Sequence, residues 1–193
     1  MRHVMPGYAL DLTTIDPADG MPWDFTIRRK RIRARRLIRE QRPYLVIGSP
    51  QCKEFCTWQK LNEARHPDDG QRAAARKNAE VHLRFVSQLY QDQIDGGRYS
   101  LHGHPRWATS WSLRRIEKIA SQPGVATVHG DQCQYGAETQ FSDSVREKGP
   151  PIMKPTGFMT NSDQIAAALG RRCQGDGGGL CSRAKGGIHR QCS

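Results

Sequence analysis

The chain has 193 residues, of which 36% are hydrophobic, and this length suits one domain with a modest core. Its formal net charge of +11 indicates a polyanionic partner, with nucleic acid the first choice and an anionic membrane surface the second. No apolar run approaches the length of a transmembrane helix, the chain lacks the pattern of a secretory signal, and six cysteines do not make a disulfide scaffold at this size. We therefore expect an intracellular protein, nuclear rather than cytoplasmic, with reduced thiols and no membrane partner.

The first part of the chain predicts a strand followed by a helix. The strand covers residues 7–12 and ends at Asp11. Thr26 is placed to cap a helix over residues 26–41. Pro43 ends this helix, because the residue before a proline disfavours the helical region.

Positive charge is concentrated in this helix. Between residues 28 and 42, nine of fifteen residues are Arg or Lys and one is acidic. Charges of one sign along a helix are typical of a phosphate-binding surface, and a solvated helix face is the alternative. The predicted nucleic-acid-binding residues are Arg28, Arg29, Lys30, Arg31, Arg33, Arg35 and Arg36.

Strands and helices alternate through the rest of the chain. The predicted strands cover residues 44–47, 99–105, 125–129 and 154–161, and the predicted helices cover 71–95, 109–121 and 163–171. Residues 13–22, 52–70 and 131–151 are predicted loops, and the second of these contains a turn over 66–70. This order is typical of an α/β fold with a mostly parallel sheet and helices on both faces. We expect this domain to span residues 1–172 and the Gly/Cys-rich tail over 173–193 to be disordered.

The loop after the strand at residues 44–47 contains a candidate nucleophile. The apolar run ends in Gly48, Ser49 and Pro50, and Cys52 follows. Ligands of open α/β sheets bind beyond the carboxyl ends of such strands, so the thiol of Cys52 is well placed for nucleophilic catalysis. The alternative is a small packing residue, because most free cysteines are buried.

The segment GSPQCKEFC over residues 48–56 resembles the nucleophile loop of the DNA (cytosine-5) methyltransferases, with Gln51 where a second proline is usual and Cys56 where serine is usual. Similar segments occur inside retrotransposon-type polyproteins of mobile elements. The resemblance implies an incomplete Rossmann-like methyltransferase sheet and a transferase that uses S-adenosylmethionine. It also implies that Cys52 attacks a flipped cytosine, while Asp11, Asp24 and Pro50 contact the cofactor.

Three departures weaken this comparison. Gly103 stands where the family carries its acid, so His102 or His104 would have to replace it as proton donor, although such histidines are more often structural. The family's first strand and glycine-rich cofactor turn are expected before Asp11, where only ten residues stand. The tail cannot supply a target-recognition domain.

Three functions remain open from the sequence. The first is a cytosine-5 methyltransferase core that is impaired or inactive as this chain alone, with another chain or the rest of a polyprotein completing its sheet. The second is a non-catalytic module that binds nucleic acid, most simply DNA, through residues 28–42. The third is a decayed mobile-element fragment.

The tail also contains metal-ligand residue types. Cys173, Cys181, His189 and Cys192 are separated by seven, seven and two residues. These spacings match none of the common short-spaced zinc sites, which use paired C-x-x-C units. We therefore predict no metal site.

Overall fold

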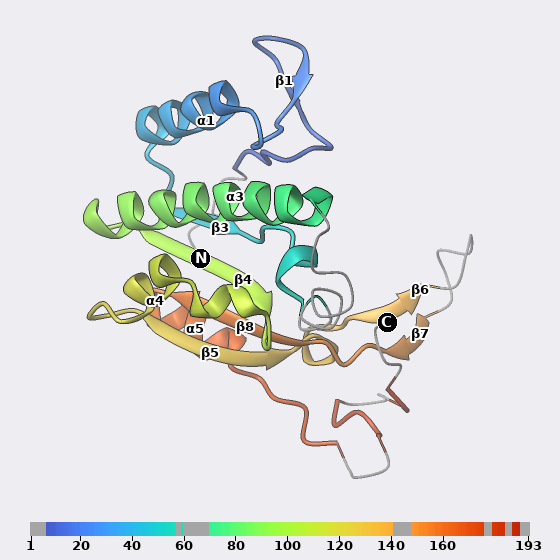
Figure 1. Cartoon of the computed structure of the whole chain (residues 1–193). Coiled ribbons are helices and arrows are strands. Elements are labelled where there is room, and N and C mark those ends of the chain that lie inside the picture. Colours follow the sequence, from blue (N-terminus) through green and yellow to red (C-terminus); the bar gives the residue numbers. More distant parts are fainter. Residues whose placement is uncertain are drawn as a thin grey trace.

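The computed structural model describes residues 7–56, 59, 70–140, 148–175, 179–183 and 187–189. Its centre is a four-stranded mixed sheet with helices on both faces (Figure 1). The strand order is β3 (Leu45–Gly48), β4 (Tyr99–Pro105), β8 (Pro155–Thr160) and β5 (Ala126–Asp131). All four strands were predicted within a few residues, because each is a short apolar run closed by Gly, Pro or Asn.

The sheet is less parallel than the sequence predicted. β3 and β4 pair in parallel, with Ile47 opposite Leu101, but β8 is antiparallel to both of its neighbours, β4 and β5. The prediction of a mostly parallel sheet is wrong for this strand. The physical reason is the connection between β5 and β8, whose described residues contain no α-helix. Parallel neighbours usually need a helical crossover, whereas this chain turns back and pairs antiparallel.

One face of the sheet is covered by α3 (Gly70–Asp95) and α4 (Arg114–Ala120). Tyr90 of α3 contacts His102 of β4, and Trp111, just before α4, lies against Gly157 of β8, where a Cβ atom would overlap the indole ring. The apolar spacing of α3 predicted its bounds closely. The predicted helix over 109–121 is instead interrupted, since Leu113 has an extended backbone between a 3-10 turn and α4.

The opposite face is covered in part by α5 (Asp163–Leu169). Phe158 points to this side of β8 and contacts Tyr135, whose hydroxyl donates a hydrogen bond of 2.5 Å to the carbonyl of Leu169. Ser162 caps α5, and its side chain accepts a hydrogen bond from the Ile165 amide. Ile47 of β3 is 66% exposed, on a strand that forms one edge of the sheet.

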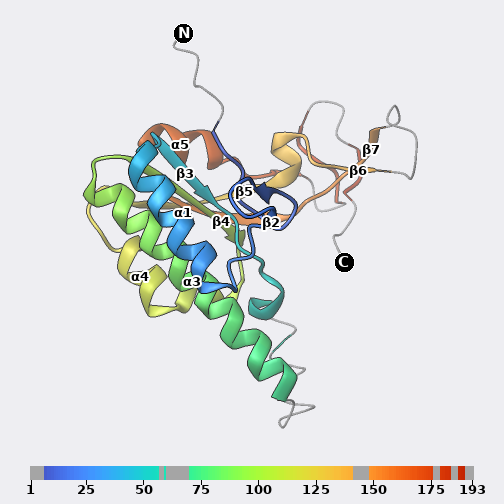
Figure 2. The same cartoon turned by 90° about the horizontal axis from the view of Figure 1, so that it is seen from above.

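The basic helix α1 (Arg28–Gln41) packs on α3, on the side away from the sheet (Figures 1 and 2). Ala34 is buried, and Leu37 and Ile38 pack against the core. The helix begins two residues later than predicted and has no side-chain cap. Its end is as predicted, with Arg42 in the left-handed conformation before Pro43.

The predicted strand over residues 7–12 is absent. The Asp11 carboxylate accepts hydrogen bonds from the backbone and the hydroxyl of Thr13, and this local turn replaces an extended strand. The first strands are instead β1 (Ile15–Asp16) and β2 (Met21–Pro22), a short antiparallel ribbon within the predicted loop.

The predicted loop over 131–151 contains the 3-10 helix η3 (Gln132–Tyr135) and the antiparallel ribbon of β6 (Glu138–Gln140) and β7 (Lys148–Pro151). This ribbon extends away from the main sheet in both views (Figures 1 and 2). These strands carry few apolar residues, so their sequence has no alternating pattern to reveal them.

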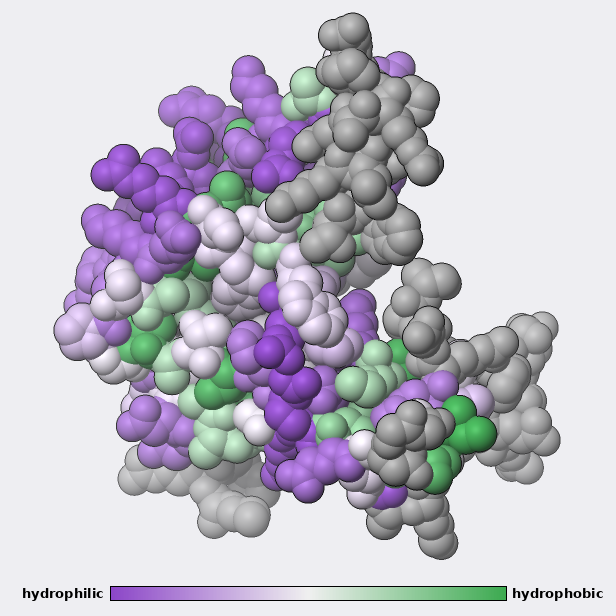
Figure 3. All heavy atoms as spheres, turned by 60° about the horizontal axis from the view of Figure 1, so that its bottom comes forward, coloured by the Kyte–Doolittle hydropathy of each residue, from purple (hydrophilic) through white to green (hydrophobic). Residues whose placement is uncertain are grey.

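The surface is largely polar on the side that Figure 3 shows, where hydrophobic residues form small groups separated by hydrophilic ones. Within the described ranges, none of the helices is both long enough and apolar enough to cross a bilayer. Of the predicted loop over 52–70, the structure describes residues 52–56, 59 and 70, so most of the predicted turn over 66–70 lies outside the described residues.

Candidate functional site

The loop after β3 places Cys52 beside a rigid anchor. Gly48 ends the strand against α3, where a Cβ atom would overlap the Tyr90 hydroxyl, so only glycine fits. Cys52 is half-buried and precedes the 3-10 helix η1 (Lys53–Phe55), whose Phe55 is completely buried. The fold therefore presents the thiol at the carboxyl end of β3, where the sequence predicted it.

His104 holds this loop in place. Its Nε2 atom donates a 3.0 Å hydrogen bond to the carbonyl of Pro50, and its Nδ1 atom accepts a 2.6 Å hydrogen bond from the Ser110 hydroxyl. This assignment follows because a carbonyl oxygen can only accept, which leaves Nδ1 without a proton in the neutral ring. His104 therefore serves the loop as a neutral structural residue.

His102 is also neutral. Its Nδ1 atom lies 3.1 Å from the Tyr90 hydroxyl, and its Nε2 atom has no hydrogen-bond partner among the described residues. Burial, with a smaller contribution from neighbouring His104, lowers the pKa of His102 to about 3, and burial also lowers the pKa of His104. These pKa shifts disfavour the imidazolium form that a proton donor would need, so neither histidine fits the predicted role.

The two carboxylates predicted to contact the cofactor are used in local turns. Asp11 is exposed and bonds Thr13, and Asp24 accepts hydrogen bonds from the amide and hydroxyl of Thr26 at 2.8 and 2.7 Å. Within the described part of the chain, no hydrogen bond or ion pair joins either carboxylate to the Cys52 loop. With Pro50 buried as well, these residues do not form a cradle for S-adenosylmethionine.

Lys30 was predicted to bind nucleic acid, but the structure places it inside the protein. Its side chain is buried, and its ammonium donates to Asp16 at 3.1 Å, to Asp19 at 2.5 Å and to the carbonyl of Met21 at 3.2 Å. Lys30 therefore cannot contact nucleic acid. The acids that neutralise it lie in the preceding ribbon, where sequence reasoning expected a plain loop.

Three other predicted contacts are also engaged within the protein. Arg33 bonds Asp16 at 2.7 Å, and Arg35 makes a two-pronged ion pair with Asp92 of α3 at 2.9 and 3.0 Å. Arg31 donates to the carbonyls of residues 25 and 26. These bonds attach the three side chains of α1 to its surroundings, so they are less free to turn toward a phosphate.

The remaining arginines of α1 form an exposed face. Arg28, Arg29, Arg36 and Arg39 are exposed. At about 100° per residue they fall within about one third of the helix circumference, together with the exposed Ile32. Arg29 and Arg36 pair with Asp19 and Glu40 at 3.4 Å, but both guanidinium groups stay largely in solvent. We call Arg28, Arg29, Arg36 and Arg39 the arginine face.

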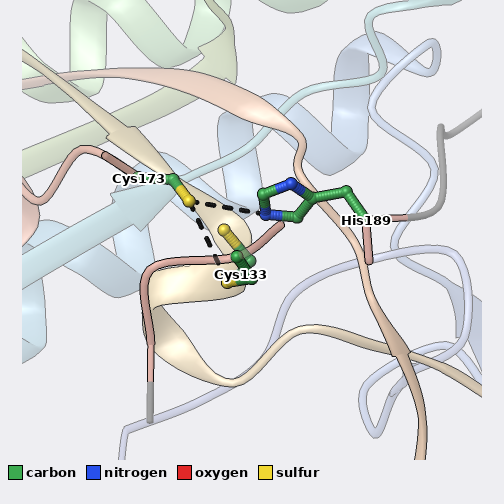
Figure 4. A group of neighbouring side chains, drawn as sticks. Cys133, Cys173 and His189 are labelled. Atoms are coloured by element: carbon green, nitrogen blue, oxygen red, sulfur yellow. Dashed lines mark hydrogen bonds between the residues drawn. The ribbon is translucent and has the colours of Figure 1, made fainter. Parts of the chain in front are cut away.

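A second constellation lies where β5 ends. Cys133, Cys173, Cys181 and His189 each direct one possible metal-ligand atom into a common space, and these atoms lie within 4.8 Å of one another. Figure 4 shows Cys133, Cys173 and His189 pointing toward one another. Sequence reasoning missed Cys133, which stands in η3 far from the tail, and considered Cys192 instead, which lies outside the described residues.

The thiols of this cluster differ in acidity. Burial raises the pKa of Cys133 to about 12. Burial also opposes ionisation of Cys173, but hydrogen bonds from the Ser182 hydroxyl and amide outweigh it and lower the pKa of Cys173 to about 6. A thiolate therefore forms more readily at Cys173 than at Cys133.

No protein-family model matches the chain, and comparisons with curated proteins and with solved structures find no significant match.

Proposed function

We propose that this chain is a nucleic-acid-binding module that uses the arginine face of α1, without catalysis by the chain alone. The single observation that supports this proposal is the arrangement of four exposed arginines on one helical face, in a chain with a net charge of +11. Guanidinium groups suit phosphate because their planar donors can bond two oxygens at once. Binding of this kind needs neither a proton donor nor a cofactor.

Replacing Arg28, Arg36 and Arg39 with glutamine should weaken duplex DNA binding about tenfold or more near 0.1 M salt. Each phosphate contact contributes about 0.9 to the slope of log affinity against log salt, so the slope should fall by up to about 2.7. Fluorescence anisotropy with a labelled duplex, measured at several salt concentrations, gives both quantities. Single-stranded DNA and RNA of the same length give the preferred substrate.

The matched control removes three positive charges elsewhere, by changing Arg114, Arg115 and Lys118 of α4 to glutamine. These residues are exposed on a different helix. If the control and the α1 variant weaken binding equally, the effect is one of net charge and the proposal of a specific face fails. Binding to anionic vesicles but not to nucleic acid would also contradict it.

We propose the chemistry of Cys52 as a second candidate function, because its half-buried thiol occupies a loop that His104 holds at the carboxyl end of β3. By resemblance to the cytosine-5 methyltransferases, its thiolate would add to carbon 6 of a pyrimidine. The residues expected to hold S-adenosylmethionine do not form a site, so methyl transfer would require a partner chain. Addition to the base does not.

Cys52 is expected to form a covalent adduct with an oligonucleotide that carries 5-azacytosine, whose electron-poor ring accepts a thiolate without a methyl donor. A sulfur–carbon bond forms at carbon 6, and ring nitrogen 5 takes a proton from water. Intact-protein mass spectrometry should show the adduct in the parent protein and in Cys56→Ser, but not in Cys52→Ser. Its absence from protein that binds the same oligonucleotide would remove Cys52 from consideration.

A further inference from the structure

We propose that Cys133, Cys173, Cys181 and His189 bind one zinc ion, which attaches the C-terminal segment to the end of β5. This inference does not depend on the proposed nucleic-acid binding. Three sulfur ligands and one imidazole nitrogen are a typical donor set of structural zinc sites.

The distances agree with tetrahedral coordination. Zinc–sulfur bonds of about 2.3 Å place two sulfur ligands of a tetrahedron about 3.8 Å apart. The Sγ atoms of Cys173 and Cys181 are 3.9 Å apart, and Nε2 of His189 is 3.4 Å from Sγ of Cys173. Since all four ligand atoms lie within 4.8 Å of one another, a single ion can contact them after small movements of the side chains.

The surroundings of the cluster suit thiolate ligands. The Gln134 amide nitrogen lies 3.6 Å from Sγ of Cys133 and 3.7 Å from Sγ of Cys181, and the Ser182 amide donates to Sγ of Cys173 at 3.4 Å. Donors of this kind orient metal ligands and stabilise their charge. Cys133 and Cys181 are also buried, so water has little access to the sulfur atoms.

The backbone of the tail is shaped to present two of the ligands. The Cys181 amide donates to the carbonyl of Gly187, and the His189 amide donates to the carbonyl of Gly179, both at 2.8 Å. Gly179 and Gly187 have φ values of 83° and 66°, a conformation that side chains disfavour. Gly179 and Gly187 therefore lie beside the antiparallel bridge between Leu180 and Ile188, which holds Cys181 and His189 next to each other.

Four protein ligands leave no position for a substrate, so the site is structural rather than catalytic. The described part of the segment that it holds buries little aliphatic surface, because Leu180 and Ile188 are exposed. A bound metal would stabilise such a segment where hydrophobic packing cannot.

The test is metal titration of the full chain, prepared without metal under reducing conditions. Cobalt(II) should bind at one ion per chain and give the strong visible bands of tetrahedral coordination with a sulfur-to-metal charge-transfer band. Zinc should then displace it. Cys133→Ser should lower zinc affinity by more than about 100-fold, since loss of an outer-shell partner alone costs 10- to 100-fold.

Cys52→Ser and Cys56→Ser are the matched controls, because both thiols lie outside the cluster, and each should bind one ion. His189→Gln changes a half-buried ligand and tests the site in case Cys133→Ser does not fold. Octahedral cobalt spectra, no stoichiometric binding, or binding unchanged in both ligand variants would overturn the proposal. So would a Cys173–Cys181 disulfide that persists under reducing conditions and excludes the ion.

Discussion

Replacing Phe55 with alanine should lower the free energy of unfolding by about 3–5 kcal/mol. The ring is 0% exposed and packs between the Arg76 guanidinium, 4.4 Å from the ring centre, and His104. Its removal leaves a cavity under the Cys52 loop that the rigid β4 strand cannot fill. Urea denaturation, monitored by circular dichroism, measures the change in the free energy of unfolding, provided that the m-value is unchanged.

Trp107→Ala is the control for this prediction. Trp107 is also aromatic but 61% exposed, so its loss should cost below about 1 kcal/mol. Equal losses in the two variants would show that Phe55 does not occupy the core. Phe55→Ala should also make Cys52 react faster with an alkylating agent, because the loop loses its anchor.

Replacing Lys30 with methionine should cost about 3 kcal/mol, because removal of one partner of a buried ion pair leaves the other charge poorly compensated. The Lys30 side chain is buried against Asp16, which stays paired with Arg33 alone in the variant. Arg36→Met is the control, since its pair with Glu40 is exposed and should contribute less than about 1 kcal/mol. Thermal and urea unfolding measure the stability of both variants relative to the parent protein.

The ion pairs of Asp16 with Lys30 and Arg33 should make the stability of the protein depend on pH. Burial of Asp16 opposes ionisation, but hydrogen bonds from the Ala18 amide and from Arg33 and Lys30 outweigh it and lower the pKa to about 2. A lowered pKa stabilises the folded state above the unfolded pKa of about 4, and this contribution disappears as the pH falls to about 2. Asp16→Asn should therefore flatten the melting temperature between about pH 4 and 2. A profile as steep as that of the parent would assign the acid sensitivity to other carboxylates.

The sequence revealed the elements whose apolar residues recur regularly. The spacing along α3 and the short runs of β3 and β4 depend only on local burial, so their bounds could be predicted closely. The antiparallel placement of β8 could not, because its own six residues do not specify its neighbours. The Cys52 loop was located correctly by the glycine and proline that end β3.

The candidate sites also depend on contacts that local sequence patterns do not specify. Lys30 was expected at a binding surface because its neighbours are basic, and only the fold shows that Asp16 and Asp19 enclose it. Cys133 carries no local signal, since η3 lies far from the tail in the sequence and meets it only in the folded chain. Contacts between residues far apart in sequence decide both cases, and single-sequence patterns do not contain them.

The strand order also determines when the sheet can be completed during synthesis. β8 is the last of the four strands to leave the ribosome, yet it separates β4 from β5. Until residues 155–160 emerge, the nascent chain can pair β3 with β4, but β5 has no partner in this sheet. Until then the edges of β4 and β5 that β8 later covers are exposed, and such unpaired edges can pair with neighbouring chains while residues 132–160 are translated.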